Sequence, residues 1–194
     1  MKKIGIAGGI GSGKSIISEV LKTMGYPVFN SDDEAKLLMV KNPEVVQKIK
    51  SIFGDEAYNG KELNKPFLAK KIFNNLDLKS ELNKIVHPAV RKAFVDWAEI
   101  QSSSLVFNEA AILFETGAYK SFDFTVLVTA PEKVRIERVV SRDNSTETEV
   151  KQRMKNQWKD DIKIEMASFV ILNDNSTLVT PQVMEMTSLF NKAI

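Results

Sequence analysis

Short apolar runs alternate along the chain with longer stretches in which apolar residues recur at helical spacing. Residues 2–7 form an apolar run that ends in glycines, which is typical of a buried strand. From Lys14 onward the apolar positions recur every three or four residues until Gly25, which indicates a helix, and residues 27–29 form a second short run. The order of strand, glycine loop, helix and strand indicates a βαβ unit and therefore a largely parallel sheet.

Three further apolar runs predict the other strands of the sheet, at residues 105–107, 124–129 and 169–172. Residues 133–157 between the last two carry a dense helical charge pattern that is interrupted near Asn144. A closing helix is expected at residues 177–192. The pattern therefore predicts an α/β fold with a five-stranded, mostly parallel sheet flanked by helices.

The middle of the chain lacks this alternation. It shows helical patterns at residues 45–53, 66–73 and 76–100, with polar breaks between them and no convincing strand. We interpret it as a helical insertion into one single domain. The expected division is a core of residues 1–41, 104–136 and 167–194, an insertion of residues 42–103, and a helical lid of residues 137–166.

The glycine loop after the first strand carries a complete G-x-x-x-x-G-K-[ST] pattern. Glycines let consecutive backbone N–H groups turn toward a phosphate, and the following helix adds its positive N-terminal end. Lys14 is expected to reach the β- and γ-phosphates, and the Ser15 hydroxyl is expected to bind Mg²⁺. A chance match is the alternative, but the strand before and the helix after are the context that the motif requires. The predicted nucleotide-binding residues are Gly8, Gly9, Ile10, Gly11, Ser12, Gly13, Lys14 and Ser15. Gly5, inside the strand, is expected to be a packing residue.

Three classes of P-loop protein compete: a small-molecule kinase, a GTPase switch and an ATPase that drives a macromolecule. A guanine-specific GTPase would normally carry N-K-x-D, and the Asn-Lys pairs at 64–65, 83–84 and 191–192 have no aspartate two residues later. A remodelling ATPase usually needs a longer chain and a basic or oligomerising surface. The kinase class predicts a carboxylate at the end of the second strand and a lid that carries arginines.

Asp32 meets the first requirement. It follows the second strand and opens a helix, so its carboxylate should lie at the carboxyl edge of the sheet and accept the proton of the acceptor hydroxyl. The alternative is that Asp32 only caps the helix, a role that Ser31 could also fill.

Arg138 and Arg142 meet the second requirement. They lie four residues apart on one helix face, where their guanidinium groups could neutralise charge on the transferred phosphoryl group. The alternative is a solvated helix face on which Glu137 and Asp143 are their partners.

Composition indicates where the protein works and which partners it binds, and says little about the reaction. The 194 residues carry a net charge of +2, which suits an anionic small molecule and falls short of the basic surface of a nucleic-acid binder. The chain has no cysteine and no apolar run near the roughly 20 residues that cross a bilayer, and we expect no secretory signal, because the first predicted strand begins at residue 2. We therefore expect a cytoplasmic protein with small-molecule partners, no nucleic acid and no membrane, as a monomer or small homo-oligomer.

Five segments together resemble the dephospho-coenzyme A kinase family: I-G-I-A-G-G-I-G-S-G-K-S, P-V-F-N-S-D-D-E-A-K, I-V-H-P-A-V-R, A-I-L-F-E-T-G and R-V-V-S-R-D. They occur in order and cover almost the whole chain. The P-loop is shared by many proteins, whereas S-D-D-E-A-K and H-P-A-V-R are far more specific. The resemblance implies a P-loop NTPase fold, with the insertion binding the acceptor, and transfer of the γ-phosphoryl group of ATP to the ribose 3′-hydroxyl of dephospho-CoA, with Mg²⁺ present.

The resemblance also implies roles for individual residues. Asp32 matches the family's general base, and Arg142 matches its lid arginine, with Arg138 one turn earlier. The family's substrate contacts match His87, Arg91 and Glu115. His87, the single histidine, would on its own be interpreted as a packing or capping residue beside Pro88. Asn173 matches an asparagine near the adenine, although the position also suits a turn.

The chain departs from the family pattern at three places. Ile16 stands where threonine is common, and we expect it to face the helix interior or its neighbours. Asn30 replaces the first aspartate of a D-A-D segment, so any contact with magnesium-bound water would pass to another carboxylate, for which Glu109 is the candidate. Ala111 replaces a proline. The predicted metal-site residues are therefore Ser15 and Glu109.

Overall fold

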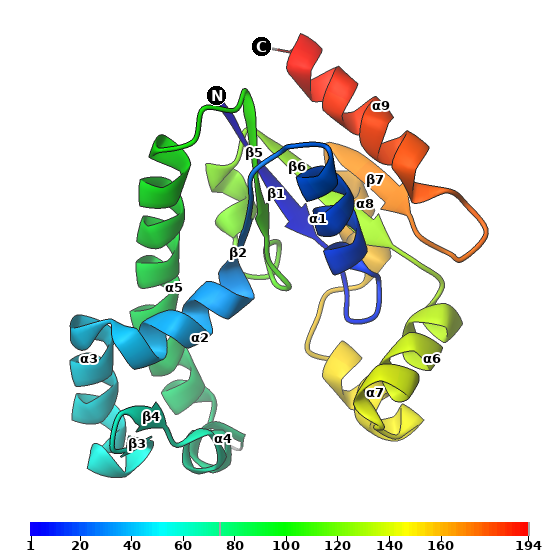
Figure 1. Cartoon of the computed structure of the whole chain (residues 1–194). Coiled ribbons are helices and arrows are strands. Elements are labelled where there is room, and N and C mark those ends of the chain that lie inside the picture. Colours follow the sequence, from blue (N-terminus) through cyan, green and yellow to red (C-terminus); the bar gives the residue numbers. More distant parts are fainter. Residues whose placement is uncertain (74, 194) are drawn as a thin grey trace. The chain divides into compact units, whose positions relative to one another are not determined.

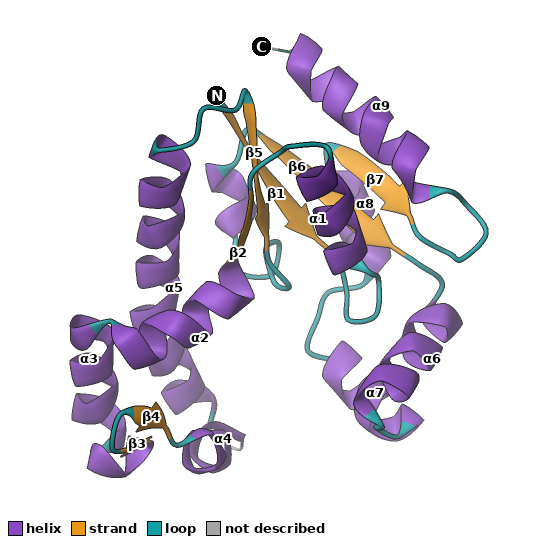
Figure 2. Ribbon diagram, viewed as in Figure 1, coloured by secondary structure: helices purple, strands orange, loops and turns teal. Residues whose placement is uncertain are grey.

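The computed structural model describes residues 1–73 and 75–193 of the chain. Its central sheet has five parallel strands in the order β2-β5-β1-β6-β7 (Figures 1 and 2). The bounds are β1 Lys2–Ala7, β2 Val28–Asn30, β5 Leu105–Glu109, β6 Phe124–Thr129 and β7 Phe169–Leu172. The sequence prediction of a five-stranded parallel sheet is confirmed, including the position of each strand.

Alternate residues of the central strand β1 face opposite sides of the sheet, as the period of a strand requires. Ile4 and Ile6 are fully buried in one hydrophobic cluster with residues of α1 (Lys14–Thr23) and α9 (Val179–Lys192). Helices α1 and α9 lie together on that face of the sheet (Figure 1). Each fully buried isoleucine or leucine contributes about 1.5–3 kcal/mol by leaving water.

Gly5 is a packing residue, as the sequence predicted. A Cβ atom at Gly5 would lie 2.5 Å from Cδ2 of Leu113 and 3.2 Å from the Phe122 ring, too close for a methyl group without a shift of neighbours. The other face of β1 is therefore filled by Leu113 and its neighbours, which belong to a second cluster with Phe114 and Leu127.

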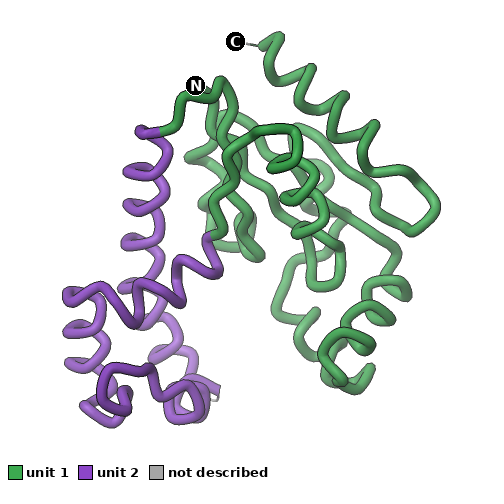
Figure 3. The backbone as a smooth tube through the Cα atoms, viewed as in Figure 1, with its two compact units in different colours: residues 1–30, 101–194 green, residues 31–100 purple. Residues whose placement is uncertain are grey.

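The chain divides into two compact units, residues 1–30 with 101–194 and residues 31–100 (Figure 3). The second unit begins with α2 rather than at residue 42, because α2 packs on α3 and α5. It also holds a small antiparallel hairpin that the sequence pattern did not predict. Its elements are α2 Ser31–Lys41, α3 Pro43–Phe53, η1 Asp55–Ala57, β3 Tyr58–Asn59, β4 Glu62–Leu63, α4 Lys65–Phe73 and α5 Leu76–Glu99.

The lid region of the first unit contains three helices, α6 Glu132–Asp143, α7 Glu147–Met154 and α8 Asp160–Met166. The predicted break near Asn144 is confirmed, since Asn144 takes the left-handed conformation with φ of 50° and ends α6. Thr146 then opens α7 with a reciprocal capping box to Glu149. A separate α8 was not predicted. Within the described residues, no helix is long and apolar enough to cross a membrane.

Candidate phosphate-binding and phosphotransfer site

The loop between β1 and α1 has the backbone shape of a phosphate cradle. Gly11 and Gly13 have φ values of 78° and 88°, in the left-handed region that glycine adopts without strain. Within the described chain, the structure gives no protein acceptor for the backbone N–H groups of Gly11, Gly13 and Ser15. These groups are therefore available to a phosphate at the N-terminus of α1.

Lys14 lies over this loop. Its Nζ donates a hydrogen bond of 2.9 Å to the carbonyl oxygen of Gly8, so the ammonium group stays at the loop rather than extending into solvent. A positive charge in that place supports the predicted contact with the β- and γ-phosphates.

Arg138 contacts the loop from α6. Its guanidinium donates to the carbonyl oxygen of Gly11 at 3.3 Å and to that of Asn173 at 2.9 Å. Sequence reasoning assigned Arg138 to the transferred phosphoryl group. The structure places its donors on the backbone of the loop and of the segment after β7, where they hold these two segments together, and its contact with a phosphoryl group stays a prediction.

Asn173 completes this contact. It is buried, and its side-chain amide donates to the carbonyl oxygen of Ser12 at 2.9 Å, while its own N–H donates to Thr129 at 2.8 Å. Asn173 thus joins the loop to the ends of β6 and β7. The predicted place near the adenine stays a prediction.

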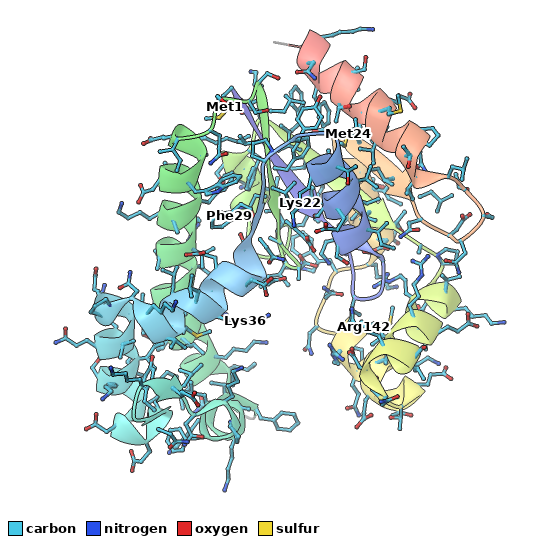
Figure 4. All side chains as sticks on the ribbon, in the orientation of Figure 1. Met1, Lys22, Met24, Phe29, Lys36 and Arg142 are labelled. Atoms are coloured by element: carbon cyan, nitrogen blue, oxygen red, sulfur yellow. The ribbon has the colours of Figure 1, made fainter. Side chains whose placement is uncertain are left out.

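Arg142 lies further along α6, in an exposed position (Figure 4). Its Nε donates to Asp143 at 2.7 Å, and Arg153 of α7 contacts the same carboxylate at 2.9 Å. These two guanidinium groups hold the pKa of Asp143 well below its usual range. This arrangement matches the alternative in which Asp143 is a partner of the lid arginines, and contact of Arg142 with a phosphoryl group stays a prediction.

The polar residues predicted for magnesium lie near the carboxyl edge of the sheet. Glu109 ends β5, is buried, and accepts a hydrogen bond of 2.7 Å from the Ser18 hydroxyl of α1. Asn30 ends β2 and is the register partner of Glu109. Ser15 is exposed in the first turn of α1. The described residues contain no group of three or more histidine, aspartate or glutamate side chains arranged for a metal.

Glu115 contacts the segment before α8. Its Oε1 accepts a hydrogen bond of 3.1 Å from the backbone N–H of Trp158 and lies 3.9 Å from the buried ammonium group of Lys163. The structure therefore gives Glu115 partners within the protein, and its predicted substrate contact stays a prediction.

The helical unit carries the other predicted residues. Asp32 is the second residue of α2, which follows β2 without a gap, and its side chain is exposed. His87 and Arg91 lie one turn apart in α5, on either side of the helix-interior Pro88. Partial burial, together with the nearby charge of Arg91, lowers the pKa of His87 below its ordinary 6.5. His87 is therefore neutral near pH 7.

This pKa shift predicts a pH-dependent stability. The unfolded chain binds the His87 proton more readily than the folded chain, so the stabilisation is present above pH 6.5 and is lost as the pH falls through the lower folded-state pKa. We expect the free energy of unfolding in urea to fall between about pH 7.5 and about pH 5, and to fall less in His87→Gln. An equal pH dependence in the two proteins would contradict the assignment.

Comparison with known proteins decides among the P-loop classes. A family model described as dephospho-CoA kinase matches residues 2–178. A curated dephospho-CoA kinase from Bacteroides fragilis is 39% identical over 193 residues, which cover 99% of this chain and 94% of the relative. One from Porphyromonas gingivalis is 40% identical over 184 residues, 94% and 91% of the two chains. The chain belongs to the dephospho-CoA kinase family.

Solved structures agree with this family at the level of the fold. A crystal structure from Thermus thermophilus has a TM-score of 0.86 at 29% identity and covers 100% of this chain and 98% of its own. The dephospho-CoA kinase from Campylobacter jejuni has a TM-score of 0.72 at 23% identity, with 98% of each chain covered. A shikimate kinase from Acinetobacter baumannii, with a TM-score of 0.51 at 15% identity, shares the P-loop kinase fold alone.

Of the two places expected for Ile16, where this chain departs from the dephospho-CoA kinase pattern, the first is wrong. Ile16 does not face the helix interior, since 48% of its surface is exposed. The buried stripe of α1 is formed instead by Ile17, Ser18 and Leu21. Ile16 lines an open cavity of about 520 Å³ with Ser15, Glu19, Val20, Thr23, Met24 and Thr180.

Sequence reasoning also missed residues that hold the phosphate-binding loop of this dephospho-CoA kinase family member. Arg135 and Gln157 contact Ile10. Neither residue lies in any of the five segments that carry the family resemblance. The available signal was weak: Arg135 stands three residues before Arg138 on the same helix, and nothing in the one-dimensional pattern showed that it turns inward.

Proposed function

We propose that this chain transfers the γ-phosphoryl group of ATP to the ribose 3′-hydroxyl of dephospho-CoA, giving coenzyme A and ADP. One observation carries the proposal: a complete P-loop, with Lys14 bonded to the carbonyl oxygen of Gly8, in a chain that matches the dephospho-CoA kinase family over residues 2–178. The chain is an enzyme of the phosphotransferase class that acts on an alcohol group.

The donor residues belong to the sheet unit. The backbone N–H groups of the loop and the Lys14 ammonium bind the phosphates of ATP, and the loop keeps its shape through Arg138 and Asn173. These groups are in place before the substrate binds, so little reorganisation is required at the moment of transfer.

The acceptor residues belong to the helical unit. Asp32 accepts the proton of the ribose hydroxyl as that oxygen attacks the γ-phosphorus, and the bond from that phosphorus to the oxygen that bridges the β- and γ-phosphates breaks. Arg91 and His87 of α5 contact the acceptor, with Arg91 supplying charge for its phosphates and neutral His87 able to donate or accept a hydrogen bond. Glu115 also contacts the acceptor. Phosphoryl transfer of this kind depends mainly on positioning and on stabilisation of charge.

Mg²⁺ fits the oxygen donors at the edge of the sheet. Ser15 offers a hydroxyl at the start of α1 and Glu109 a carboxylate at the end of β5, and Mg²⁺ usually takes few protein ligands and completes its shell with phosphates and water. When bound, the ion would supply positive charge that stabilises the negative charge of the triphosphate during transfer. Ser18 orients Glu109 for this role through the 2.7 Å hydrogen bond.

The lid and the cellular setting complete the proposal. Arg142 and Arg138 stabilise the charge of the transferred group, Arg142 by exchanging Asp143 for a phosphate oxygen, and Asn173 lies near the adenine.

The two substrates, ATP and dephospho-CoA, are small molecules. We propose a cytoplasmic enzyme, a monomer or small homo-oligomer that binds no nucleic acid and no membrane, in line with its modest charge and lack of cysteine.

An acceptor panel tests the proposal directly. ADP release is measured with ATP and, in turn, dephospho-CoA, AMP, CMP, shikimate or no acceptor. We expect release that depends on dephospho-CoA, with one phosphoryl group added to the ribose by mass spectrometry. Faster turnover of another acceptor would favour a related small-molecule kinase, and equal ADP release without an acceptor would favour a slow regulatory ATPase.

A further inference from the structure

Arg135 is a buried arginine in the first turn of α6, and its side chain contacts the phosphate-binding loop. Only 8% of its surface is exposed. Its Nε donates a hydrogen bond of 2.9 Å to the carbonyl oxygen of Ile10, in the middle of the loop, and its Nη1 donates to Oδ2 of Asp160 at 3.0 Å. A guanidinium group that is always charged is therefore buried against the loop.

The glycine pattern of the loop reflects this close approach. Positions 9 and 11 are variable in the P-loop pattern, yet both are glycine here. A Cβ atom at Gly9 would collide with the Nη2 and Cζ atoms of Arg135, and one at Gly11 would collide with the backbone carbonyl of Arg135. The loop and the arginine thus fit together at van der Waals distance over several atoms.

The charge of Arg135 is balanced by a buried cluster. Asp160 also accepts a hydrogen bond of 2.8 Å from Thr129 and lies 2.9 Å from the ammonium group of Lys163, which is 1% exposed. Glu115 is 3.9 Å from Lys163, so two cations face two carboxylates. Burial alone raises the pKa of Asp160, but the bonds from Lys163 and Thr129 and the charge of Arg135 lower it below its ordinary value. Asp160 therefore remains charged at neutral pH, as a buried arginine requires.

Both backbone polar groups of Ile10 form hydrogen bonds to side chains. Its carbonyl oxygen accepts one from Arg135, and its N–H donates one of 2.8 Å to the side-chain oxygen of Gln157. Both peptide planes of this residue are thereby held, and both bonds come from the lid region rather than from the sheet. A loop held in this way pays less conformational entropy when it closes on a phosphate.

We propose that Arg135, held by Asp160, is a positioning residue that keeps the loop in its phosphate-binding shape before ATP binds. The proposal rests on the loop being the ATP site. Arg135 acts through the Ile10 carbonyl and the contact with Gly9, and it touches neither substrate. Loss of Arg135 is therefore expected to change the KM for ATP and to leave the KM for the acceptor unchanged.

Steady-state kinetics of Arg135→Gln and Arg135→Lys test this role. Loss of a charge-assisted hydrogen bond is expected to raise the KM for ATP about tenfold or more, while kcat and the KM for dephospho-CoA change little. Lys133→Gln removes the same charge from an exposed position of α6 and serves as the matched control. If only the melting temperature falls and the KM for ATP stays at the wild-type value, Arg135 is merely structural and the proposal is wrong.

A double-mutant cycle adds a second readout. Gly9→Ala is expected to raise the KM for ATP when Arg135 is present, because the added methyl group displaces the guanidinium, and to have little further effect in the Arg135→Gln background. Equal effects in the two backgrounds would overturn the proposed coupling. Should the Arg135 variants fail to fold, Asp160→Asn, which removes only the charge of the partner, must raise the KM for ATP, and an unchanged value refutes the proposal.

The outcome can be separated from a failure of the ATP site itself. If Lys14→Ala loses ATP binding while Arg135→Gln and Asp160→Asn do not, the positioning role alone is wrong. If Lys14→Ala also leaves ATP binding intact, the assignment of the loop as the ATP site fails.

Discussion

Lys14→Ala is expected to weaken ATP binding and catalysis together. In the structure the ammonium group lies 2.9 Å from the carbonyl oxygen of Gly8, at the loop in which the N–H groups of Gly11, Gly13 and Ser15 have no protein acceptor among the described residues. A charge-assisted hydrogen bond contributes about 1.5–3 kcal/mol, so the affinity for ATP should fall roughly 10- to 100-fold. The loss in kcat/KM should be larger, because charge on the phosphoryl oxygens is redistributed in the transition state.

Isothermal titration with ATP and steady-state assays with dephospho-CoA measure the two effects. Lys22→Ala is the matched control: it removes the same group from the last turn of the same helix, where Lys22 forms an exposed ion pair with Glu19 at 2.7 Å (Figure 4). Such surface pairs contribute little to stability. Unchanged ATP affinity in Lys14→Ala would refute the interpretation of the glycine loop.

Asp32→Asn is expected to reduce kcat by about 10² or more, with little change in the KM for ATP. The substitution separates the two roles that the sequence allows for Asp32. The structure places Asp32 in the first turn of α2, after Ser31, so a purely structural Asp32 would lose only about 0.3–1 kcal/mol of charge–dipole interaction on this change and would keep its turnover. A general base would not, since the amide cannot accept the proton of the ribose hydroxyl.

Two further measurements sharpen this test. The acidic limb of the pH dependence of kcat/KM for dephospho-CoA should be lost in Asp32→Asn, because that limb reports the free enzyme's base. Asp33→Asn is the control, since Asp33 is the neighbouring exposed carboxylate of α2 and pairs with Lys36 at 2.7 Å. Near-normal turnover in Asp32→Asn would leave Asp32 as a structural residue of the first turn of α2 and move the search for the base to other residues.

The strands of the sheet could be predicted because each one is marked by a short apolar run in the local sequence. Residues 4–7, 105–107 and 124–129 are mostly apolar over the length of one strand, and strands of a parallel sheet are buried on both faces. The hairpin Tyr58–Asn59 and Glu62–Leu63 could not be predicted in this way, because two-residue strands are too short to show a period. The place of α2 among the helices of the second unit was also hidden, since it depends on packing against α5, which lies far along the chain.

The directions of side chains on α6 were the main limit for the site. Arg135, Arg138 and Arg142 lie on one short helix, and the sequence pattern selected the last two. The structure buries Arg135, places Arg138 on the loop and leaves Arg142 exposed beside Asp143. Which arginine turns inward depends on what the rest of the fold brings against the helix, here Asp160 from the start of α8.

By itself the sequence determined that a triphosphate-binding loop stands between a buried strand and a helix, because that motif depends on the conformational freedom of adjacent glycines and on the N-terminus of the next helix. It also determined the order of the strands along the chain. Only the tertiary structure decided what holds the loop. The carbonyl oxygens of Ile10, Gly11 and Ser12 are bonded by side chains more than a hundred residues away. Such bonds form only after the sheet has assembled, because buried charges and long-range hydrogen bonds depend on neighbours that no local pattern specifies.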